Sequence, residues 1–275
     1  MQSSELDRRL HMVREIASSA GEIVLKYYDA KVAVEWKAPG DPVTAADRAA
    51  NDAIISSLHR LFPGEAVLSE EASDDMERLG RDLLWVVDPL DGTKEFLKRN
   101  GEFSIMIGMV QAGRPTLGVV LQPAASLTYY GAAGIGAWMS NPGGERLLRV
   151  TTFDQTNQLR MVASRSHFDE RLDRVRKRLG IHQILRSGSV GLKCGMIARG
   201  DCELYIHPSS RVNMWDSCGP AAILSAAGGT MTDVHGNALD YTGVDVRHRS
   251  GLLSSHGRLH EKIVEVIVAE GVTVT

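Results

Sequence analysis

An apolar run that ends in two aspartates constrains the fold of this chain more than any other feature. Leu83 to Val87 are all apolar, and Asp88 and Asp91 follow at once on either side of Pro89. Such a run is typical of a buried strand. A carboxylate is costly to bury unless something pairs with it. The stretch therefore predicts a buried strand whose terminal acids bind a cation.

The size and composition of the chain are those of an ordinary globular protein. Its 275 residues, 43% of them hydrophobic, suffice for one large domain or two closely packed ones. A net charge of -3 argues against binding to a nucleic-acid polymer. The three cysteines form no CxxC pair, which indicates a reducing compartment, and we expect a cytoplasmic protein. No run of apolar residues is long enough to span a membrane, and we expect neither a membrane-spanning helix nor a signal peptide.

The spacing of apolar residues and the turn signals predict α/β architecture throughout. Expected helices cover 5–28, 44–61 with Thr44 as N-cap, 92–96, 168–179, a segment from about 190, 215–227 and 260–269. Expected strands cover 32–36, 66–71, 83–88, 103–113, 115–123, 126–133, 136–140, 160–164, 183–187, 203–207 and 251–255, with a loop at 37–43 and a turn at 141–145. We interpret the chain as two α/β halves, 1–150 and 151–275, sharing one packed body.

Five acids stand at predicted strand ends or helix starts. They are Asp47, Glu70, Asp88, Asp91 and Asp216, and Glu71 ends the same predicted strand as Glu70. A layered α/β protein opens a crevice at such positions. Oxygen ligands from separate elements suit Mg²⁺, and two such ions about 4 Å apart can hold both oxygens of an in-line phosphoryl displacement. The acids therefore predict a magnesium site for phosphate chemistry.

Thr93 follows Asp91 by two residues and offers a hydroxyl that can hold a water molecule. Asp47 can accept the threonine proton, so the pair can work as a general-base relay. Gly92 and Thr93 also begin the short predicted helix, whose first N–H groups can bind a phosphate.

Each part of this pattern also has an ordinary structural explanation. Asp-Pro-x-Asp-Gly is a common turn sequence, and an acid in the first turn of a helix, such as Asp216, is often a cap. The chain contains no P-loop, no EF-hand and no zinc-like histidine cluster. The combination of acids favours a site over a set of unrelated turns and caps.

Two long motifs resemble the signatures of the inositol monophosphatase superfamily. They are "WVVDPLDGTKEF" at 85–96 and "NMWDSCGPAAILSAAGG" at 213–229. "DPVTAAD" at 41–47 and "VLSEE" at 67–71 resemble its other acidic segments, so the resemblance covers nearly the whole chain. Within the superfamily, "DGTKEF", "KRNGEFS", "SRSH" and "DVHGNALDYT" are similar to the 3′(2′),5′-bisphosphate nucleotidases of sulfur metabolism.

The resemblance implies a fold and a set of residue roles. The implied fold is an alternating α/β/α/β/α layered sandwich. The implied ligands of two or three Mg²⁺ ions are Glu70, Asp88, the carbonyl of Leu90, Asp91 and Asp216. The implied catalytic residues are Thr93, Asp47 and Glu70. The implied substrate-binding residues are Gly92 and Thr93 at the scissile phosphate, and Ser164, His167, Ser189 and Lys193 on the nucleoside side.

One departure from the inositol-preferring members bears on the substrate. They carry a glutamate seven residues before the aspartate of the tryptophan–aspartate pair, where this chain has Ser209. Arg211 nearby adds positive charge that suits a second phosphate. We therefore expect removal of the 3′-phosphate of adenosine 3′,5′-bisphosphate, leaving AMP, with the phosphosulfate analogue as a further substrate.

Two other functions stay open at this point. One is an inositol or sugar phosphatase, whose substrate is also a small phosphate ester. The other is a non-catalytic metal-binding regulator, which should have lost a ligand or the Thr93–Asp47 pair, although this chain retains both. The sequence is also compatible with a homodimer.

Overall fold

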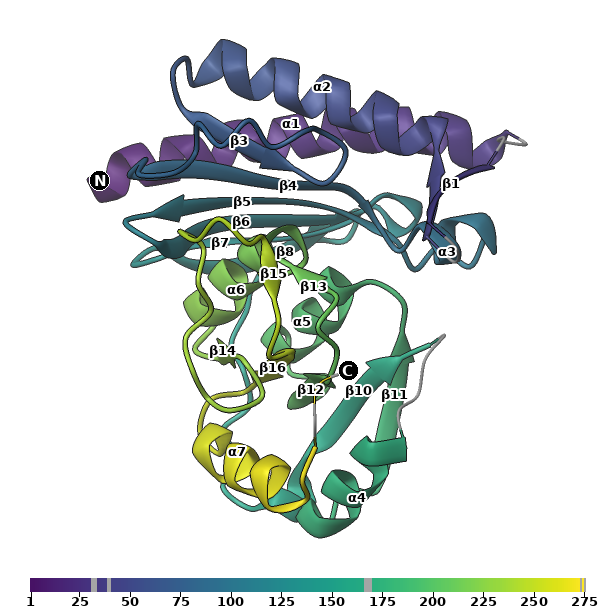
Figure 1. Cartoon of the computed structure of the whole chain (residues 1–275), viewed down its shortest axis with the longest axis vertical. Helices are drawn as coiled ribbons and strands as arrows, with labels where there is room; N and C mark the ends of the chain where they lie inside the picture. The colour runs from purple at the N-terminus through teal and green to yellow at the C-terminus, as the bar shows by residue number, and fades with distance from the viewer. Residues whose placement is uncertain (31–33, 39–40, 166–169, 273, 275) are drawn as a thin grey trace.

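The computed structural model describes residues 1–30, 34–38, 41–165, 170–272 and 274. Helices and sheets alternate in layers along the long axis of the molecule (Figure 1). The layers are α1 with α2, a seven-stranded sheet, α5 with α6, a five-stranded sheet, and α4 with α7. The expected α/β/α/β/α sandwich is confirmed.

The helices lie close to their predicted positions. They are α1 (Ser3–Asp29), α2 (Ala45–Leu61), α3 (Thr93–Leu97), α4 (Glu170–Leu179), α5 (Val190–Ala198), α6 (Met214–Ala226) and α7 (His260–Ala269), with 3-10 turns η1 (Pro123–Ala125) and η2 (Thr156–Gln158). In α1, Leu6, Leu10 and Val13 are buried at helical spacing, as the apolar pattern predicts. None of the helices in the described residues combines the length and apolar character that crossing a membrane requires.

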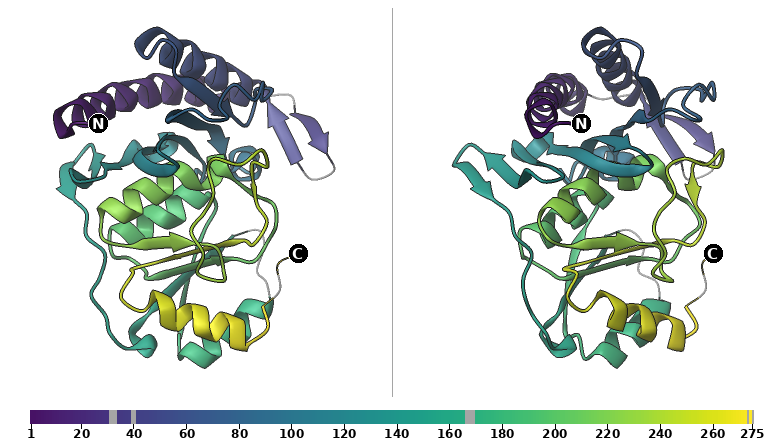
Figure 2. Two further views of the ribbon diagram at one scale, coloured as in Figure 1. Left: turned by 60° about the vertical axis from the view of Figure 1, so that its left-hand side comes forward. Right: turned by 90° about the vertical axis from the view of Figure 1, so that its left-hand side faces the viewer.

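The first sheet has the strand order β3-β4-β5-β6-β7-β8-β9. Its strands are β3 (Ala66–Ser69), β4 (Leu83–Asp91), β5 (Ser104–Gln111), β6 (Arg114–Gln122), β7 (Leu127–Ala132), β8 (Gly136–Asn141) and β9 (Gly144–Leu147). Strand β3 runs parallel to β4, and the other neighbours are antiparallel. Helices α1 and α2 cover one face and α6 lies on the other (Figure 2).

The second sheet has the order β11-β10-β12-β16-β14. Its strands are β10 (Arg160–Ser164), β11 (Gln183–Ser187), β12 (Leu204–His207), β14 (Thr230–Thr232) and β16 (Leu252–Ser255). Helix α5 packs on one face, and α4 and α7 share an apolar core with the strands on the other. Helices α5 and α6 therefore lie between the two sheets.

Helix α6 approaches the first sheet at backbone contact. A Cβ atom on Gly108 of β5 would lie 2.6 Å from the amide nitrogen of Gly219, and one on Gly118 of β6 would overlap the carbonyl oxygen of Gly219. Side chains at these positions would push the helix off the sheet. The glycines thus fix the height of α6 above β5 and β6, and with it the position of Asp216.

Several short strands were not expected. A loop was predicted at 37–43, but β1 (Val34–Ala38) pairs with β2 (Asp41–Thr44), so that prediction is wrong in part. The expected strand at 32–36 begins outside the described residues. The predicted turn at 141–145 contains the first residues of β9. Strands β13 (Val212–Asn213) and β15 (Arg247–His248) form a separate pair. The division at residue 150 stays a prediction, since α5 and α6 contact both sheets.

Candidate active site

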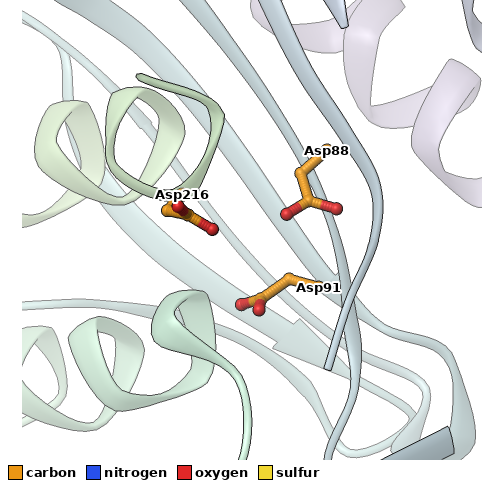
Figure 3. Close-up of side chains that lie close together, drawn as sticks. All are labelled: Asp88, Asp91 and Asp216. Carbon is orange, nitrogen blue, oxygen red and sulfur yellow. The ribbon is translucent and has the colours of Figure 1, made fainter. Parts of the chain in front are cut away.

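Three aspartates from two layers converge at one point. Strand β4 ends in Asp88 and Asp91, and its pairing with β5 shifts register between them, where Pro89 cannot donate a ladder bond. Asp216 lies in the first turn of α6. One carboxylate oxygen of each aspartate lies within 4.8 Å of the others. Their side chains point toward a common centre (Figure 3).

The electrostatics of the cluster favour a bound cation. Asp88 is buried, and burial, followed by the negative charges of Glu70 and Asp91, raises its pKa well above the usual range. Burial and the charge of Asp91 likewise raise the pKa of Asp216. Acids this close repel one another unless a cation neutralises them. Carboxylate and carbonyl oxygens are the ligands that Mg²⁺ takes, so these residues fit that ion.

Hydrogen bonds from the protein orient each carboxylate. Asp88 Oδ1 accepts from the amide of Leu90 at 3.0 Å. Asp216 Oδ2 accepts from the amide of Asn213 at 2.6 Å, which completes a capping box at the start of α6. Asp216 is therefore both a helix cap and a member of the cluster, and the two interpretations weighed for it are compatible.

Asp91 is held by the first turn of α5. Its Oδ2 accepts from Ser189 Oγ at 2.5 Å, from the amide of Val190 at 2.6 Å and from that of Gly191 at 3.3 Å. The amides at the start of a helix carry partial positive charge, which stabilises a carboxylate there. No local pattern in the sequence indicates this bond between the two halves, although a serine directly before a predicted helix at 190 is a signal for an N-cap.

The predicted Thr93–Asp47 pair lies together. Thr93 Oγ1 donates to Asp47 Oδ1 at 3.3 Å and is also 3.3 Å from the carbonyl oxygen of Leu90. Asp47 Oδ2 accepts from the amide of Thr44 at 2.8 Å and from its hydroxyl at 2.6 Å. Asp47 is buried, so its position is fixed. The geometry suits general-base work, and the role itself stays a prediction.

Glu70 follows β3 directly. Its amide donates to the carbonyl of Val87 in β4 at 3.1 Å, which keeps it beside the strand that ends in the aspartates. Its charge is the second cause of the raised pKa of Asp88. The carboxylate thus acts on the cluster, and its predicted role as a ligand and catalytic residue is untested.

The residues predicted on the nucleoside side differ in their surroundings. Ser164 is half-buried at the end of β10, beside Ser187 of β11. His167 lies outside the described residues. Ser189 is fully buried, and besides Asp91 its hydroxyl bonds to that of Ser104 at 2.7 Å.

Lys193 is buried, with 1% of its surface exposed. Its Nζ donates to the carbonyl of Gly188 and lies 4.9 Å from the ring centre of Tyr205. Burial lowers the pKa of Lys193, and the nearby charges of Asp91 and Glu95 oppose that shift. The bonds described for Ser189 and Lys193 are to the protein itself, and their contact with a substrate stays a prediction.

Comparison with known proteins gives a consistent result. The model of the inositol monophosphatase family matches residues 5–271. A protein of Salmonella typhimurium named 3′(2′),5′-bisphosphate nucleotidase CysQ is 41% identical over 238 residues, which are 85% of this chain and 94% of that protein. The protein of the same name from Escherichia coli K12 is 40% identical over 236 residues, again 85% of this chain and 94% of the other.

Solved structures show the same fold. CysQ from Bacteroides thetaiotaomicron superimposes with a TM-score of 0.77 at 29% identity, over 90% of this chain and 97% of the other. The IMPase of Thermotoga maritima superimposes with a TM-score of 0.81 at 25% identity, over 96% of this chain and 98% of the other. The family match spans both sheets and all five predicted acids.

Proposed function

The chain belongs to the inositol monophosphatase family, and we propose that it is a Mg²⁺-dependent phosphomonoesterase that removes the 3′-phosphate of adenosine 3′,5′-bisphosphate and leaves AMP. The phosphosulfate analogue is a further substrate in this proposal. The observation that carries the reaction class is the convergence of Asp88, Asp91 and Asp216 beside the Thr93–Asp47 pair. The identity to the CysQ nucleotidases over most of the chain carries the choice of substrate.

The metal ligands in this proposal are those that the family resemblance implies. Glu70, Asp88, Asp91, Asp216 and the carbonyl of Leu90 would hold two or three Mg²⁺ ions. When bound, the ions supply positive charge that neutralises the carboxylates and polarises the phosphoryl oxygens. Hydrogen bonds to Asp88, Asp91 and Asp216 hold these carboxylates in place before any ion binds, which lowers the cost of organising the site.

The general base in this proposal is the Thr93–Asp47 pair. Thr93 Oγ1 accepts a hydrogen bond from the attacking water and passes its own proton toward Asp47 Oδ1. The bonds from Thr44 to Asp47 Oδ2 keep Oδ1 directed at Thr93. The amides of Gly92 and Thr93 would contact the scissile phosphate, since they lie directly after Asp91.

The rest of the nucleotide would lie against the second half of the chain. Ser164, His167 and the turn before α5, which includes Ser189, are the proposed contacts. Lys193 donates a hydrogen bond to the carbonyl of Gly188 in that turn, and its positive charge favours the anionic substrate. To contact the substrate directly, it would have to give up this bond. Ser209, in place of the glutamate of inositol-preferring members, leaves no carboxylate there to bind inositol hydroxyl groups.

Phosphate release from four substrates measured side by side tests the proposal. They are adenosine 3′,5′-bisphosphate, its 3′-phosphosulfate analogue, inositol 1-phosphate and fructose 1,6-bisphosphate, each with Mg²⁺. We expect the highest kcat/KM for the two nucleotides and no activity in the Asp91→Asn variant. A higher kcat/KM for inositol 1-phosphate would leave the phosphatase class standing and overturn the nucleotidase. Full activity of Asp91→Asn would overturn the metal site.

A further inference from the structure

The buried side chain of Arg78 forms hydrogen bonds between two segments. One of them begins with Glu70, and the other packs against the start of α6, which carries Asp216. Arg78 belongs to the β3–β4 segment (70–82), which begins with Glu70, and only 4% of its surface is exposed. Its Nη1 donates to the carbonyl of Gly243 at 2.8 Å and its Nη2 to that of Val244 at 3.0 Å. The segment is 13 residues long and has no regular strand or helix of its own. A loop of that length usually needs specific bonds to hold one conformation.

Asp74 holds the guanidinium in place. Its Oδ2 accepts from Arg78 Nε at 2.8 Å, and its Oδ1 accepts from the amide of Met76 at 3.1 Å. The carboxylate therefore closes a turn of the β3–β4 segment and orients the arginine in one arrangement. All three nitrogens of the guanidinium have acceptors, and its planar fork fixes the direction of the bonds to the two carbonyls, which the rotatable ammonium of a lysine would not.

The other segment, 241–248, supports the start of α6. The carbonyl of Val246 accepts from the amide of Met214, the first residue of the helix, at 2.8 Å. Tyr241 Oη donates to Ser217 Oγ at 2.9 Å, and His248 Nε2 bonds to the same hydroxyl at 2.8 Å. The first turn of α6, which carries Asp216, is therefore fixed by this segment.

Apolar packing also joins the same two regions. Leu68 of β3 and Leu84 of β4 share a cluster with Met214 of α6 and with Tyr241. Apolar contact holds surfaces together but has little directionality, whereas the two bonds from Arg78 define how far the segments can slide. The side of the site that carries Glu70 and the side that carries Asp216 are thus connected by a directional link.

We propose that Arg78 is a positioning residue for the metal site, one that fixes Glu70 relative to Asp216. The inference rests on the proposed function, which makes both acids metal ligands. Arg78 touches neither the substrate nor the reacting atoms. Groups that orient metal ligands without binding the ion typically contribute 10- to 100-fold to affinity, and we expect roughly 10-fold for Arg78 because it acts through a loop.

Direct metal binding tests this role without an assay of turnover. The dissociation constant of Mn²⁺, followed by electron paramagnetic resonance of the free ion, is measured for the wild type and for Arg78→Ala, Arg78→Lys and Arg81→Ala. Arg81 is the matched control, because it is exposed in the same segment and its Nε donates to the carbonyl of Glu77 within that segment. We expect both Arg78 variants to bind Mn²⁺ about 10-fold more weakly and Arg81→Ala to bind as the wild type does.

The other outcomes separate the possible failures. Wild-type affinity in both Arg78 variants overturns the positioning role, and so does an equal loss in Arg81→Ala, which would indicate general loosening of the segment. If Arg78→Ala does not fold, Arg78→Lys decides, since it keeps the charge and loses the fork. The Asp91→Asn variant serves as the reference for the site: unchanged Mn²⁺ binding there would refute the proposed metal ligands themselves.

Discussion

Asp47 and Asp216 occupy the same position in two different helices. Each is the third residue of its helix and completes a capping box, so one of its carboxylate oxygens, Oδ2, accepts from the backbone of the N-cap residue. The helix start thereby fixes the side chain, and the other oxygen is directed by the same bond. A residue that first suggests a simple cap can therefore also serve in a site.

The Thr93–Asp47 pair should behave as one catalytic unit. Thr93→Val keeps the shape of the side chain and removes the hydroxyl, so we expect kcat to fall by about 10²-fold or more, while Mg²⁺ affinity is kept. Asp47→Asn should lose as much and should also lower stability by about 1 kcal/mol, because it weakens the cap of α2. The double variant should be no worse than the poorer single one. Steady-state kinetics at saturating Mg²⁺ measure this, and losses that multiply would rule out a relay.

The sequence identified the acids more easily than their supporting bonds. Asp88, Asp91 and Thr93 lie within one short motif, so their proximity follows from local geometry. The bond from Ser189 to Asp91 joins residues 98 positions apart, and no local pattern reports such a contact. Burial of Lys193 was missed for the same reason, since tertiary packing decides it.

At the scale of elements, the glycine contact between α6 and the first sheet should be intolerant of any side chain. Gly118→Ala would place a methyl group against the backbone of Gly219, so we expect a loss of about 2 kcal/mol or more in unfolding free energy. Gly21→Ala in α1 is the matched control. Its methyl group would meet the end of the flexible Leu121 side chain at 2.6 Å, and alanine favours the helix, so the net change should be small.

Urea unfolding of the two variants measures the difference. If Gly118→Ala were as stable as Gly21→Ala, the close approach would not set the position of the helix. Because α6 carries Asp216, we also expect Gly118→Ala to weaken Mg²⁺ binding, whereas Gly21→Ala should leave it unchanged.

Elements with a strong internal pattern were predicted, and those defined by a distant partner were not. Helix α7 was placed at 260–269, as observed, because its apolar spacing and length are properties of the segment itself. Strands β13 and β15 have two residues each and exist only as a pair between Val212 and His248 and between Asn213 and Arg247. A pairing of that kind follows from the packing of 241–248 on α6 and has no local signal.

At the scale of the whole molecule, the acid cluster should lower stability when no metal is bound. Burial and the charges of Glu70 and Asp91 raise the pKa of Asp88, so this destabilisation begins above its ordinary value of 3.8 and is complete once the pH exceeds the raised value. At about pH 8 in chelator, Asp88→Asn should therefore melt several degrees above the wild type, at roughly 2–4 °C per kcal/mol.

Added Mg²⁺ should reverse that order. At about 100 times its dissociation constant, the ion should stabilise the wild type by about 2.7 kcal/mol and the Asp88→Asn variant far less. Thermal melts with and without Mg²⁺ provide the comparison. A chelated Asp88→Asn protein that melts below the chelated wild type would show that the cluster is not strained by charge.

Acid stability should depend on two buried histidines that are not members of the acid cluster. His260 bonds to Thr232 Oγ1 at 2.9 Å and to Ser255 Oγ at 2.8 Å, and burial lowers its pKa from 6.5 to about 4. The folded state thus holds the neutral ring, so the stability from this group is full above pH 6.5 and is lost as the pH falls toward 4. His248, with its pKa also lowered to about 4, should act in the same direction.

The variant His260→Gln isolates this contribution. We expect the loss of unfolding free energy caused by the substitution to be smaller at about pH 4 than at about pH 7. The difference should be up to roughly 3 kcal/mol, since each pH unit contributes about 1.4 kcal/mol. Urea unfolding across that range measures the change. An equal cost at both ends of the range would show that the folded protein does not lower the pKa of His260.

The position of α5 and α6 between the sheets has a consequence for the order of synthesis. Every strand of the first sheet has been synthesised once Leu147 is added, yet the face that receives these helices stays uncovered until residues 190–226 follow. Met106, Val120 and Tyr129 on that face would remain exposed to solvent over this interval. Asp88 and Asp91 are likewise made long before Asp216, so a nascent chain carries an apolar surface and an incomplete metal site together. Both defects are removed once α5 packs against Met106, Val120 and Tyr129 and α6 docks on the glycines of β5 and β6.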